Sequence, residues 1–257
     1  MPPSWGVLLG TREPLSMRAR QRAGGWLSDS EQRRLADMDD VRKAMFLACR
    51  HGLRMLLADS SAPAAKWRLS SPSGRAPRVE RGQGGGARWS ARPMLSVSHS
   101  GNWLACAKAP VAMGIDMEVL APSARRDVRA MAELVCSPAE CRWLEGMAGD
   151  ERQQAFIQLW CLKEAYVKCL GTGLDLALMR RMECKKAPAC VMGGINPPRA
   201  TRAAHARLWH GRADDGAYVC LACCSKQQVP PILLSFASTL PLVSWNEDML
   251  WELDWTV

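Results

Sequence analysis

Two acidic side chains stand close together in an apolar stretch near the middle of the chain. Asp116 and Glu118 belong to the segment "GIDME", which begins at Gly114 and has the apolar character of a buried strand. Residues two apart on a strand project from the same face, so the two carboxylates point together. Like charges this close are costly to bury unless a cation neutralises them. Mg²⁺ suits this role because it prefers carboxylate oxygens and leaves positions for water and phosphate. Two solvated acids on an edge strand are the alternative interpretation.

A predicted helix further along the chain carries a third carboxylate. Glu164 stands 48 residues after Asp116, and Trp160, Glu164 and Lys168 are spaced four apart, which places them on one stripe of the helix. An exposed helix can carry such a glutamate and lysine as an ordinary surface pair. The stripe here begins at a tryptophan and has bulky neighbours, which indicates a largely buried helix. We therefore favour a metal site with an adjacent base or phosphate-binding lysine.

Hydrophobic periodicity predicts the elements that must position these side chains. Strands are predicted over 5–10, 94–99, 103–109 and 111–119, and a hairpin over 206–224. Helices are predicted over 28–38, 39–59, 127–135, 137–147 and 151–171, with Ser28 and Ser137 as caps and Gly171 closing the last helix. Residues 59–93 have the composition of a loop with a short strand at 66–69, and the acidic, Trp-rich end is a packed terminal segment.

Composition limits the class of protein. The 257 residues are 48% hydrophobic, which is enough for a sizeable core, and no apolar run is long enough to predict a membrane span. The net charge of +9 favours an acidic partner: nucleic acid, a phosphorylated metabolite or an acidic protein. The 11 cysteines form no disulfide framework and no secretory signal precedes them, so we expect reduced thiols and a cytoplasmic protein. Cys220 and Cys223 form a C-x-x-C, but their surroundings are typical of an apolar strand rather than a zinc or redox site.

Four motifs in a fixed order carry a family resemblance. "GIDME", followed by "LWCLKEAYVKCLGTGL", resembles the two signature motifs of the 4'-phosphopantetheinyl transferases, G-[IV]-D-x-E and W-x-x-K-E-[AS]-x-x-K. Upstream, "LSVSHSGNWLACA" resembles the S-H-S block of the larger, Sfp-type members, and "WRLSSPSGRAPRV" resembles their W…G-[KR]-x-P segment. The resemblance covers residues 28–225.

The resemblance implies a reaction and a set of residues for it. Enzymes of this family move the phosphopantetheine arm of coenzyme A onto a serine of an apo acyl, peptidyl or aryl carrier protein and release 3',5'-ADP. By similarity, Asp116, Glu118 and Glu164 hold Mg²⁺ against the pyrophosphate of coenzyme A. Glu164 and Lys168 are then the catalytic residues, with Lys168 acting as the general base or as a phosphate partner. Such a transfer needs charge neutralisation and alignment more than a protein nucleophile, which agrees with the residue types present.

The resemblance also implies residues that bind coenzyme A. Ser98 and His99 match the pair that contacts the nucleotide phosphates, and Arg75 matches the basic residue of the upstream segment. Lys163, next to the third acid, is expected to help to bind phosphate. Glu140 matches a further acid that lies close to the site in some members.

The length of the chain matches the larger subfamily, whose site forms within one chain. The resemblance implies an α+β, pseudo-dimeric fold with two similar α/β halves, mainly antiparallel sheets and a monomeric state. Residues 1–112 are then an N-terminal half that contributes to coenzyme A binding, and residues 113–257 are a C-terminal half with the Mg²⁺ motifs. Met45 stands where the family often has an arginine for the 3'-phosphate. The basic residue that would hold the 3'-phosphate in its place stays open among Arg33, Arg34, Arg42 and Lys43. The basic stretch 81–92 is expected to be a disordered surface loop.

Two other functions remain as alternatives. The charge of +9 is compatible with a nucleic-acid-binding protein, although the sequence has no helix-turn-helix signature, zinc-finger spacing or RNP-like strand. The three acids are also compatible with a Mg²⁺-dependent phosphohydrolase, although nothing in the sequence indicates a dedicated water-activating site. We therefore expect coenzyme A and a carrier protein as partners, and neither nucleic acid nor a membrane.

Overall fold

The computed structural model describes residues 4–22, 25–58, 67–70, 72, 74–80, 92–122, 124, 126–186, 204–230, 232, 234–236, 243–245 and 249–255. The chain divides into two compact units. The first comprises Met1–Met113 with Pro230–Leu240, and the second comprises Gly114–Val229 with Pro241–Val257. Both units combine helices with mainly antiparallel sheets, which confirms the predicted α+β class. The functional division at residue 112 and the similarity of the two halves stay predictions.

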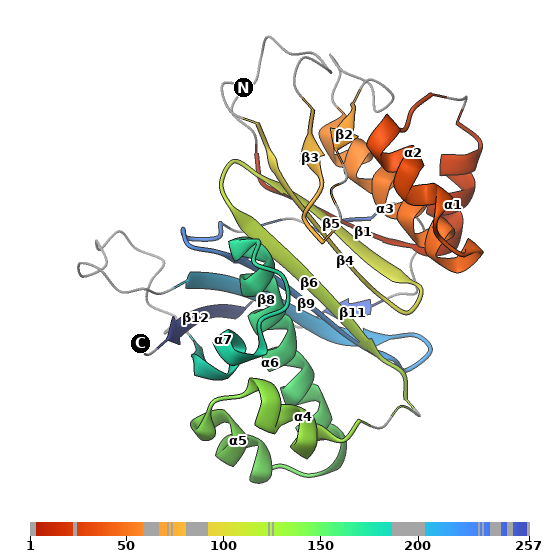
Figure 1. Cartoon of the computed structure of the whole chain (residues 1–257). Coiled ribbons are helices and arrows are strands. Elements are labelled where there is room, and N and C mark those ends of the chain that lie inside the picture. Colours follow the sequence, from red (N-terminus) through yellow and green to blue (C-terminus); the bar gives the residue numbers. More distant parts are fainter. Residues whose placement is uncertain are drawn as a thin grey trace. The chain divides into compact units, whose positions relative to one another are not determined.

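The first unit is built on a four-stranded sheet in the order β10-β1-β5-β4 (Figure 1). Its strands are β1 (Gly6–Thr11), β4 (Met94–Ser100), β5 (Trp103–Ala109) and β10 (Leu234–Phe236), and its helices are α1 (Arg12–Arg20), α2 (Asp29–Ala36) and α3 (Asp40–Leu57). A separate ribbon joins β2 (Leu69–Ser70) to β3 (Arg78–Val79). β5 is antiparallel to β1 and β4, whereas β10 runs parallel to β1. The core forms where α3 packs against β1 and β5, because these elements present apolar side chains such as Leu8, Leu53 and Leu104 to one another.

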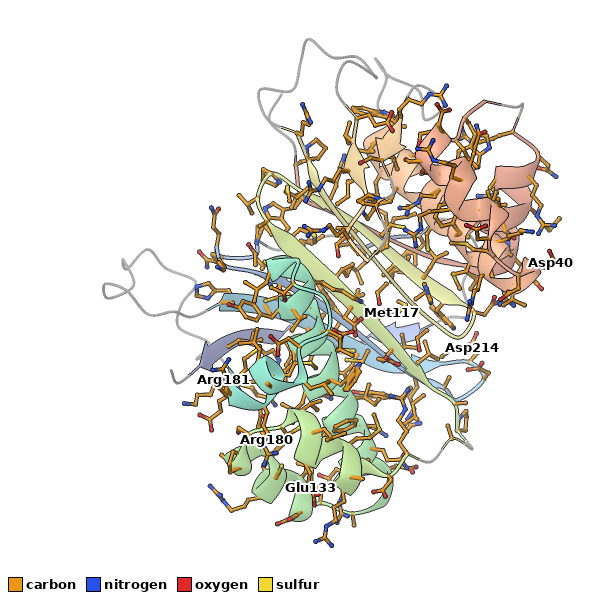
Figure 2. The ribbon with its side chains drawn as sticks, in the orientation of Figure 1. Asp40, Met117, Glu133, Arg180, Arg181 and Asp214 are labelled. Carbon is orange, nitrogen blue, oxygen red and sulfur yellow. The ribbon has the colours of Figure 1, made fainter. Side chains whose placement is uncertain are left out.

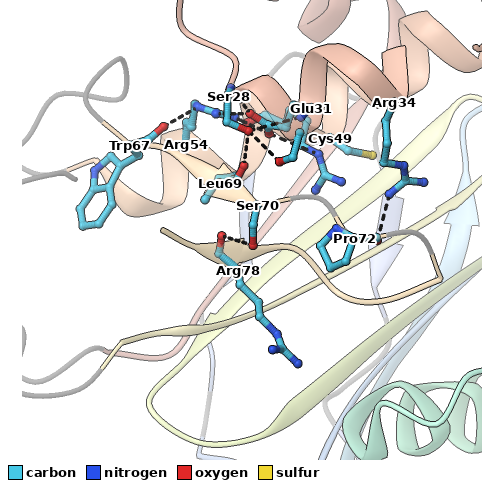
Figure 3. Close-up of polar contacts among 12 residues, drawn as sticks. Ser28, Glu31, Arg34, Cys49, Arg54, Trp67, Leu69, Ser70, Pro72 and Arg78 are labelled. Atoms are coloured by element: carbon cyan, nitrogen blue, oxygen red, sulfur yellow. Dashed lines mark hydrogen bonds and ion pairs between the residues drawn. The ribbon is translucent and has the colours of Figure 1, made fainter. Parts of the chain in front are cut away.

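A buried ion pair ties α2 to α3 in the first unit. Arg54 Nη2 donates to Glu31 Oε2 at 2.6 Å, and neither side chain is exposed. Glu31 also accepts from the backbone N–H of Ser28 at 2.9 Å, which completes the capping box at the start of α2. Arg54 Nε donates to the backbone oxygen of Trp67 at 2.9 Å, so the same guanidinium holds the segment that leads into β2 (Figure 3).

The second unit is built on a larger sheet in the order β6-β9-β8-β12-β7, with β11 paired to β8. Its strands are β6 (Met113–Leu120), β7 (Met182–Lys186), β8 (Ala204–Ala213), β9 (Tyr218–Ser225), β11 (Val243–Trp245) and β12 (Met249–Trp255). Its helices are α4 (Val128–Val135), α5 (Pro138–Glu145), α6 (Gly149–Leu170) and α7 (Leu176–Arg181). α6 crosses the sheet and contacts β9, β8 and β7 (Figure 1), so its buried face and these strands form one core.

The predicted elements around the acidic motifs are confirmed, with small shifts at their ends. α1, α7 and β7 were not predicted. The Trp-rich end forms β12, which is held between β8 and β7 by long-range pairing that no local pattern reveals. The basic stretch 81–92 lies outside the described residues except for Arg92, and Cys190 lies outside them too. Within the described part of the chain, no helix has both the length and the apolar character needed to cross a membrane.

Candidate functional site

β6 and α6 approach each other closely at Gly114. A Cβ atom added to Gly114 would lie 1.9 Å from the backbone oxygen of Ala165 and 2.5 Å from the backbone nitrogen of Cys169. Because both atoms belong to the backbone of α6, only glycine fits at this position. The glycine of the first motif therefore allows the strand with Asp116 to lie against the helical turn between Glu164 and Lys168.

The first acid of the strand is paired with the lysine of the helix. Lys168 Nζ donates to Asp116 Oδ1 at 2.6 Å. The Asp116 side chain is only 4% exposed, whereas the Lys168 side chain is 29% exposed. Met117, labelled in Figure 2, follows Asp116 on the strand and is completely buried. The buried carboxylate thus meets a cation that still reaches solvent, in a short charge-assisted hydrogen bond.

The second acid of the strand is paired with an arginine that sequence reasoning missed. Arg126 Nη2 donates to Glu118 Oε2 at 3.1 Å. The backbone N–H of Arg126 donates to Gln153 Oε1 at 3.3 Å, which holds the loop after β6 against α6. Arg126 belongs to none of the four motifs. Its position soon after the strand is the one feature of the sequence that could have indicated a basic partner for Glu118.

Glu164 shares an electrostatic environment with both acids of the strand. Burial raises the pKa of the Glu164 carboxyl above its ordinary value. The nearby ammonium of Lys168 opposes this shift, and the charges of Asp116 and Glu118 add to it. The raised pKa of Glu164 thus comes first from burial, and the two neighbouring carboxylates disfavour its charged form further. Perturbed groups of this kind are typical of functional sites.

The chemistry of these side chains fits a hard divalent cation. Three carboxylates from β6 and α6 provide the oxygen ligands that Mg²⁺ prefers. Among the residues that the structure describes, no three His, Cys, Asp or Glu side chains already surround a common metal position. Asp116 and Glu118 are instead engaged with Lys168 and Arg126. To hold a metal ion, these acids would exchange an ammonium or guanidinium partner for the ion.

Lys163 lies in the interior and not at the predicted phosphate site. Its side chain is completely buried, and its Nζ lies 2.6 Å from Glu140 Oε2. Three backbone oxygens also surround this ammonium, those of Val135 at 3.0 Å and of Met179 and Met182 at 2.8 Å. All three N–H donors of the lysine are therefore used inside the protein. This placement contradicts the prediction that Lys163 helps to bind phosphate. Glu140, which was expected close to the three acids, is paired with this internal ammonium.

The remaining predicted ligands lie in the first unit. Ser98 and His99 are neighbours on β4, with Ser98 buried and His99 exposed. Arg75 is exposed in the turn after Gly74, whose φ of 66° favours glycine. Their predicted contact with nucleotide phosphates stays a prediction. Met45, at the position where the family often has an arginine, is buried in the core.

The open candidates for the 3'-phosphate are all described, and two of them have partners within the protein. Arg34 donates to the backbone oxygen of Pro72 at 3.5 Å (Figure 3). Arg42 pairs with Asp39 at 3.3 Å. The choice among Arg33, Arg34, Arg42 and Lys43 stays open.

Comparison with known proteins identifies the family of this segment. Residues 112–223 match the sequence model of the 4'-phosphopantetheinyl transferase superfamily. The matched segment contains β6 and α6 together with all of the acidic and basic side chains that meet between them. It belongs to this superfamily, which confirms the resemblance carried by the motifs.

Individual relatives agree with this assignment. A Synechocystis protein provisionally named 4'-phosphopantetheinyl transferase is 30% identical over 136 residues, which are 52% of this chain and 52% of the relative. A 4'-phosphopantetheinyl transferase of Bacillus subtilis is 35% identical over 84 residues, which are 33% of this chain and 36% of the relative. The transferase Sfp of Bacillus subtilis strain 168 shows the same identity over the same shares. The chain thus spans about half or less of the length of the curated relatives it matches.

Proposed function

We propose that this chain is an Sfp-type 4'-phosphopantetheinyl transferase. It moves the phosphopantetheine arm of coenzyme A onto a serine of an apo acyl, peptidyl or aryl carrier protein and releases 3',5'-ADP. The observation that carries the proposal is the pairing of Asp116 with Lys168 between β6 and α6, inside the segment that matches the family. The positive net charge is suited to attract both the anionic coenzyme A and an acidic carrier protein.

Each side chain of the site has a role in the proposed reaction. Asp116, Glu118 and Glu164 would hold Mg²⁺, which would neutralise charge on the pyrophosphate. The carrier serine gives its hydroxyl proton to a base or to bound water, and its oxygen forms a bond to the phosphorus that bears the pantetheine arm. The bond from this phosphorus to the bridging oxygen breaks, and its electron pair leaves with 3',5'-ADP. Lys168 is placed to hold a phosphate oxygen once a metal ion replaces it at Asp116. Because Lys168 is paired with Asp116 as an ammonium, which cannot accept a proton, we assign it this role and not that of the general base.

The two units share one arrangement, which supports the predicted similarity of the two halves. In each unit a capping-box glutamate is paired with a buried cation that follows it by 23 residues: Glu31 with Arg54, and Glu140 with Lys163. Glu140 and Lys163 follow Glu31 and Arg54 by the same number of residues. The same shift along the sequence places Val7, Leu9 and Met55 of the first unit at the positions of the three acids of the second. Only the second unit therefore carries the carboxylates that a metal ion needs.

The proposal is tested by the mass of an apo carrier protein after incubation with this protein, coenzyme A and Mg²⁺. We expect a gain of one phosphopantetheine group, and no gain when EDTA is present. Asp116→Asn should lower the rate by about 10²-fold or more, because charge neutralisation at the phosphates is lost. Glu133→Gln is the matched control, since Glu133 is an exposed acid of α4 that pairs with the exposed Arg129 at 3.5 Å.

The same experiment separates the alternative functions. Full activity of Asp116→Asn would remove the metal assignment. Loss of coenzyme A without any carrier protein would instead indicate a phosphohydrolase. If neither peptidyl, polyketide nor fatty-acid carriers gain mass, a salt-sensitive shift of DNA would test the nucleic-acid alternative. We further expect the active species to be a monomer in the cytoplasm, which gel filtration with light scattering and cell fractionation would check.

A further inference from the structure

The ammonium of Lys163 is completely enclosed in the second unit. Its side chain has no exposed surface and four oxygen atoms lie within 3.0 Å of Nζ. These oxygens come from the end of α4, from α5, from α7 and from the start of β7, as the residues Val135, Glu140, Met179 and Met182 show. One side chain of α6 therefore anchors four other elements.

Glu140 completes this cluster from the opposite side. Its Oε2 accepts from Lys163 Nζ at 2.6 Å and from the backbone N–H of Ser137 at 2.7 Å. Its Oε1 accepts from the backbone N–H of Cys184 at 2.9 Å. The carboxylate thus joins the start of α5 to β7, and no oxygen of it is left without a donor. Because the ammonium and the carboxylate both have their charge and hydrogen bonds satisfied, the positions of the two side chains are fixed.

The pair also closes one edge of the sheet. Among the described strands, β7 is the last in the sheet order and is paired with β12 alone. On the other side, Lys163 binds the carbonyl oxygen of Met182 and Glu140 binds the N–H of Cys184. Residues two apart on a strand present their backbone groups to the same side, so the two charged side chains stand where a further strand would pair.

This anchor lies directly beside the third acid of the proposed metal site. Lys163 and Glu164 are consecutive on α6, so their side chains leave the helix about 100° apart. Lys163 points toward α5, α7 and β7, whereas Glu164 shares the environment of Asp116 on β6. Because Lys163 is held by four oxygens, α6 cannot rotate about its axis without breaking this cluster. The rotation of α6 is what sets the direction of Glu164.

We propose that the Lys163–Glu140 pair is a positioning device that holds Glu164 in register with Asp116 and Glu118 for divalent-cation binding. This inference rests on the proposed function. It assigns to the lysine of the second signature motif a role in the geometry of the metal site and no contact with the substrate. The equivalent pair of the first unit, Glu31 with Arg54, has Met55 beside it instead of an acid.

The equivalent pair provides a matched control for the test. Glu140→Gln and Glu31→Gln each remove the charge of a buried capping-box glutamate that faces a buried cation. Mg²⁺ binding to the whole chain is measured as the rise in Tm with Mg²⁺ concentration and by isothermal titration calorimetry. We expect both variants to have a lower Tm in EDTA. We expect only Glu140→Gln to weaken Mg²⁺ binding, by about tenfold, which is typical when a residue that orients a metal ligand is removed.

The outcomes separate this inference from the function on which it rests. If the wild-type chain does not bind Mg²⁺, the metal site itself is wrong and the inference falls with it. If the wild-type chain binds Mg²⁺ and Glu140→Gln binds it equally well, the pair is only a stabilising element and the inference alone is overturned. Should Glu140→Gln fail to fold, the double variant Lys163→Met with Glu140→Leu replaces both charges by apolar groups, which buried ion pairs often tolerate. Weakened Mg²⁺ binding in that variant supports the inference, and unchanged binding refutes it.

Discussion

The contact between Gly114 and α6 allows a sharp prediction for Gly114→Ala. The added Cβ would lie 1.9 Å from the backbone oxygen of Ala165, whereas real Cβ contacts essentially never fall below 3.0 Å. The helix must therefore retreat from β6 by about 1 Å or more, since the obstacle is backbone and cannot turn aside. Overpacking of a core costs about 1–3 kcal/mol, and we expect the upper end of this range here. The same shift separates Asp116 from Lys168, which are 2.6 Å apart.

Two measurements check this prediction. Urea unfolding followed by tryptophan fluorescence should show a midpoint lowered by about 1 M. The phosphopantetheine transfer rate should fall by about 10²-fold, because a displacement of about 1 Å in a reacting site has an effect of this size. Gly146→Ala is the control, since its Cβ would meet only the backbone oxygen of Trp143 at 3.5 Å and its φ is −70°. If Gly114→Ala unfolds and reacts like the control, β6 and α6 do not pack as described and the reasoning is refuted.

Two further predictions concern stability. The Nδ1 atom of His51 accepts from Arg22 at 3.0 Å, and burial followed by nearby arginines lowers the pKa of His51 to about 4. Since protonation is disfavoured in the folded state, the stability that neutral His51 contributes is present above pH 6.5 and is lost as the pH falls toward 4. The Tm difference between wild type and His51→Gln should therefore shrink over this range, and a constant difference would contradict the assignment. Gly171 ends α6 with a φ of 71° and open space around it, so Gly171→Ala should cost about 1 kcal/mol in urea unfolding through backbone strain alone. A cost no larger than that of Gly146→Ala would show that the left-handed turn is not retained.

Local patterns in the sequence were sufficient to predict the elements of the candidate site. The alternation of "GIDME" predicted that Asp116 and Glu118 share a face of a strand, and the spacing of four predicted the stripe with Glu164 and Lys168. The caps Ser28 and Ser137 were also predicted, because a capping box involves only residues a few positions apart. Such features depend on neighbours along the chain, and the family motifs record the same neighbours.

The partner of each charge was decided by the tertiary structure. Lys163 has the same residue type as Lys168 and lies five positions away, yet one is enclosed by four oxygens and the other pairs with Asp116 near the surface. The sequence could not separate them, because the difference arises from other elements that pack against α6, namely α4 and α5 before it and α7 and β7 after it. Arg126 was missed because it lies in the loop after β6, outside the four motifs.

Sequence and structure thus determined different properties of this protein. The sequence by itself indicated the superfamily of the segment 112–223 through its motifs, the α+β class through that resemblance, and the shared face of the acids through periodicity. Only the tertiary structure decided the place of β12 within the sheet, the assignment of Pro230–Leu240 to the first unit, and the burial of the Lys163–Glu140 pair. These properties depend on contacts between distant segments, whose free energy comes from burying apolar surface and satisfying buried polar groups together.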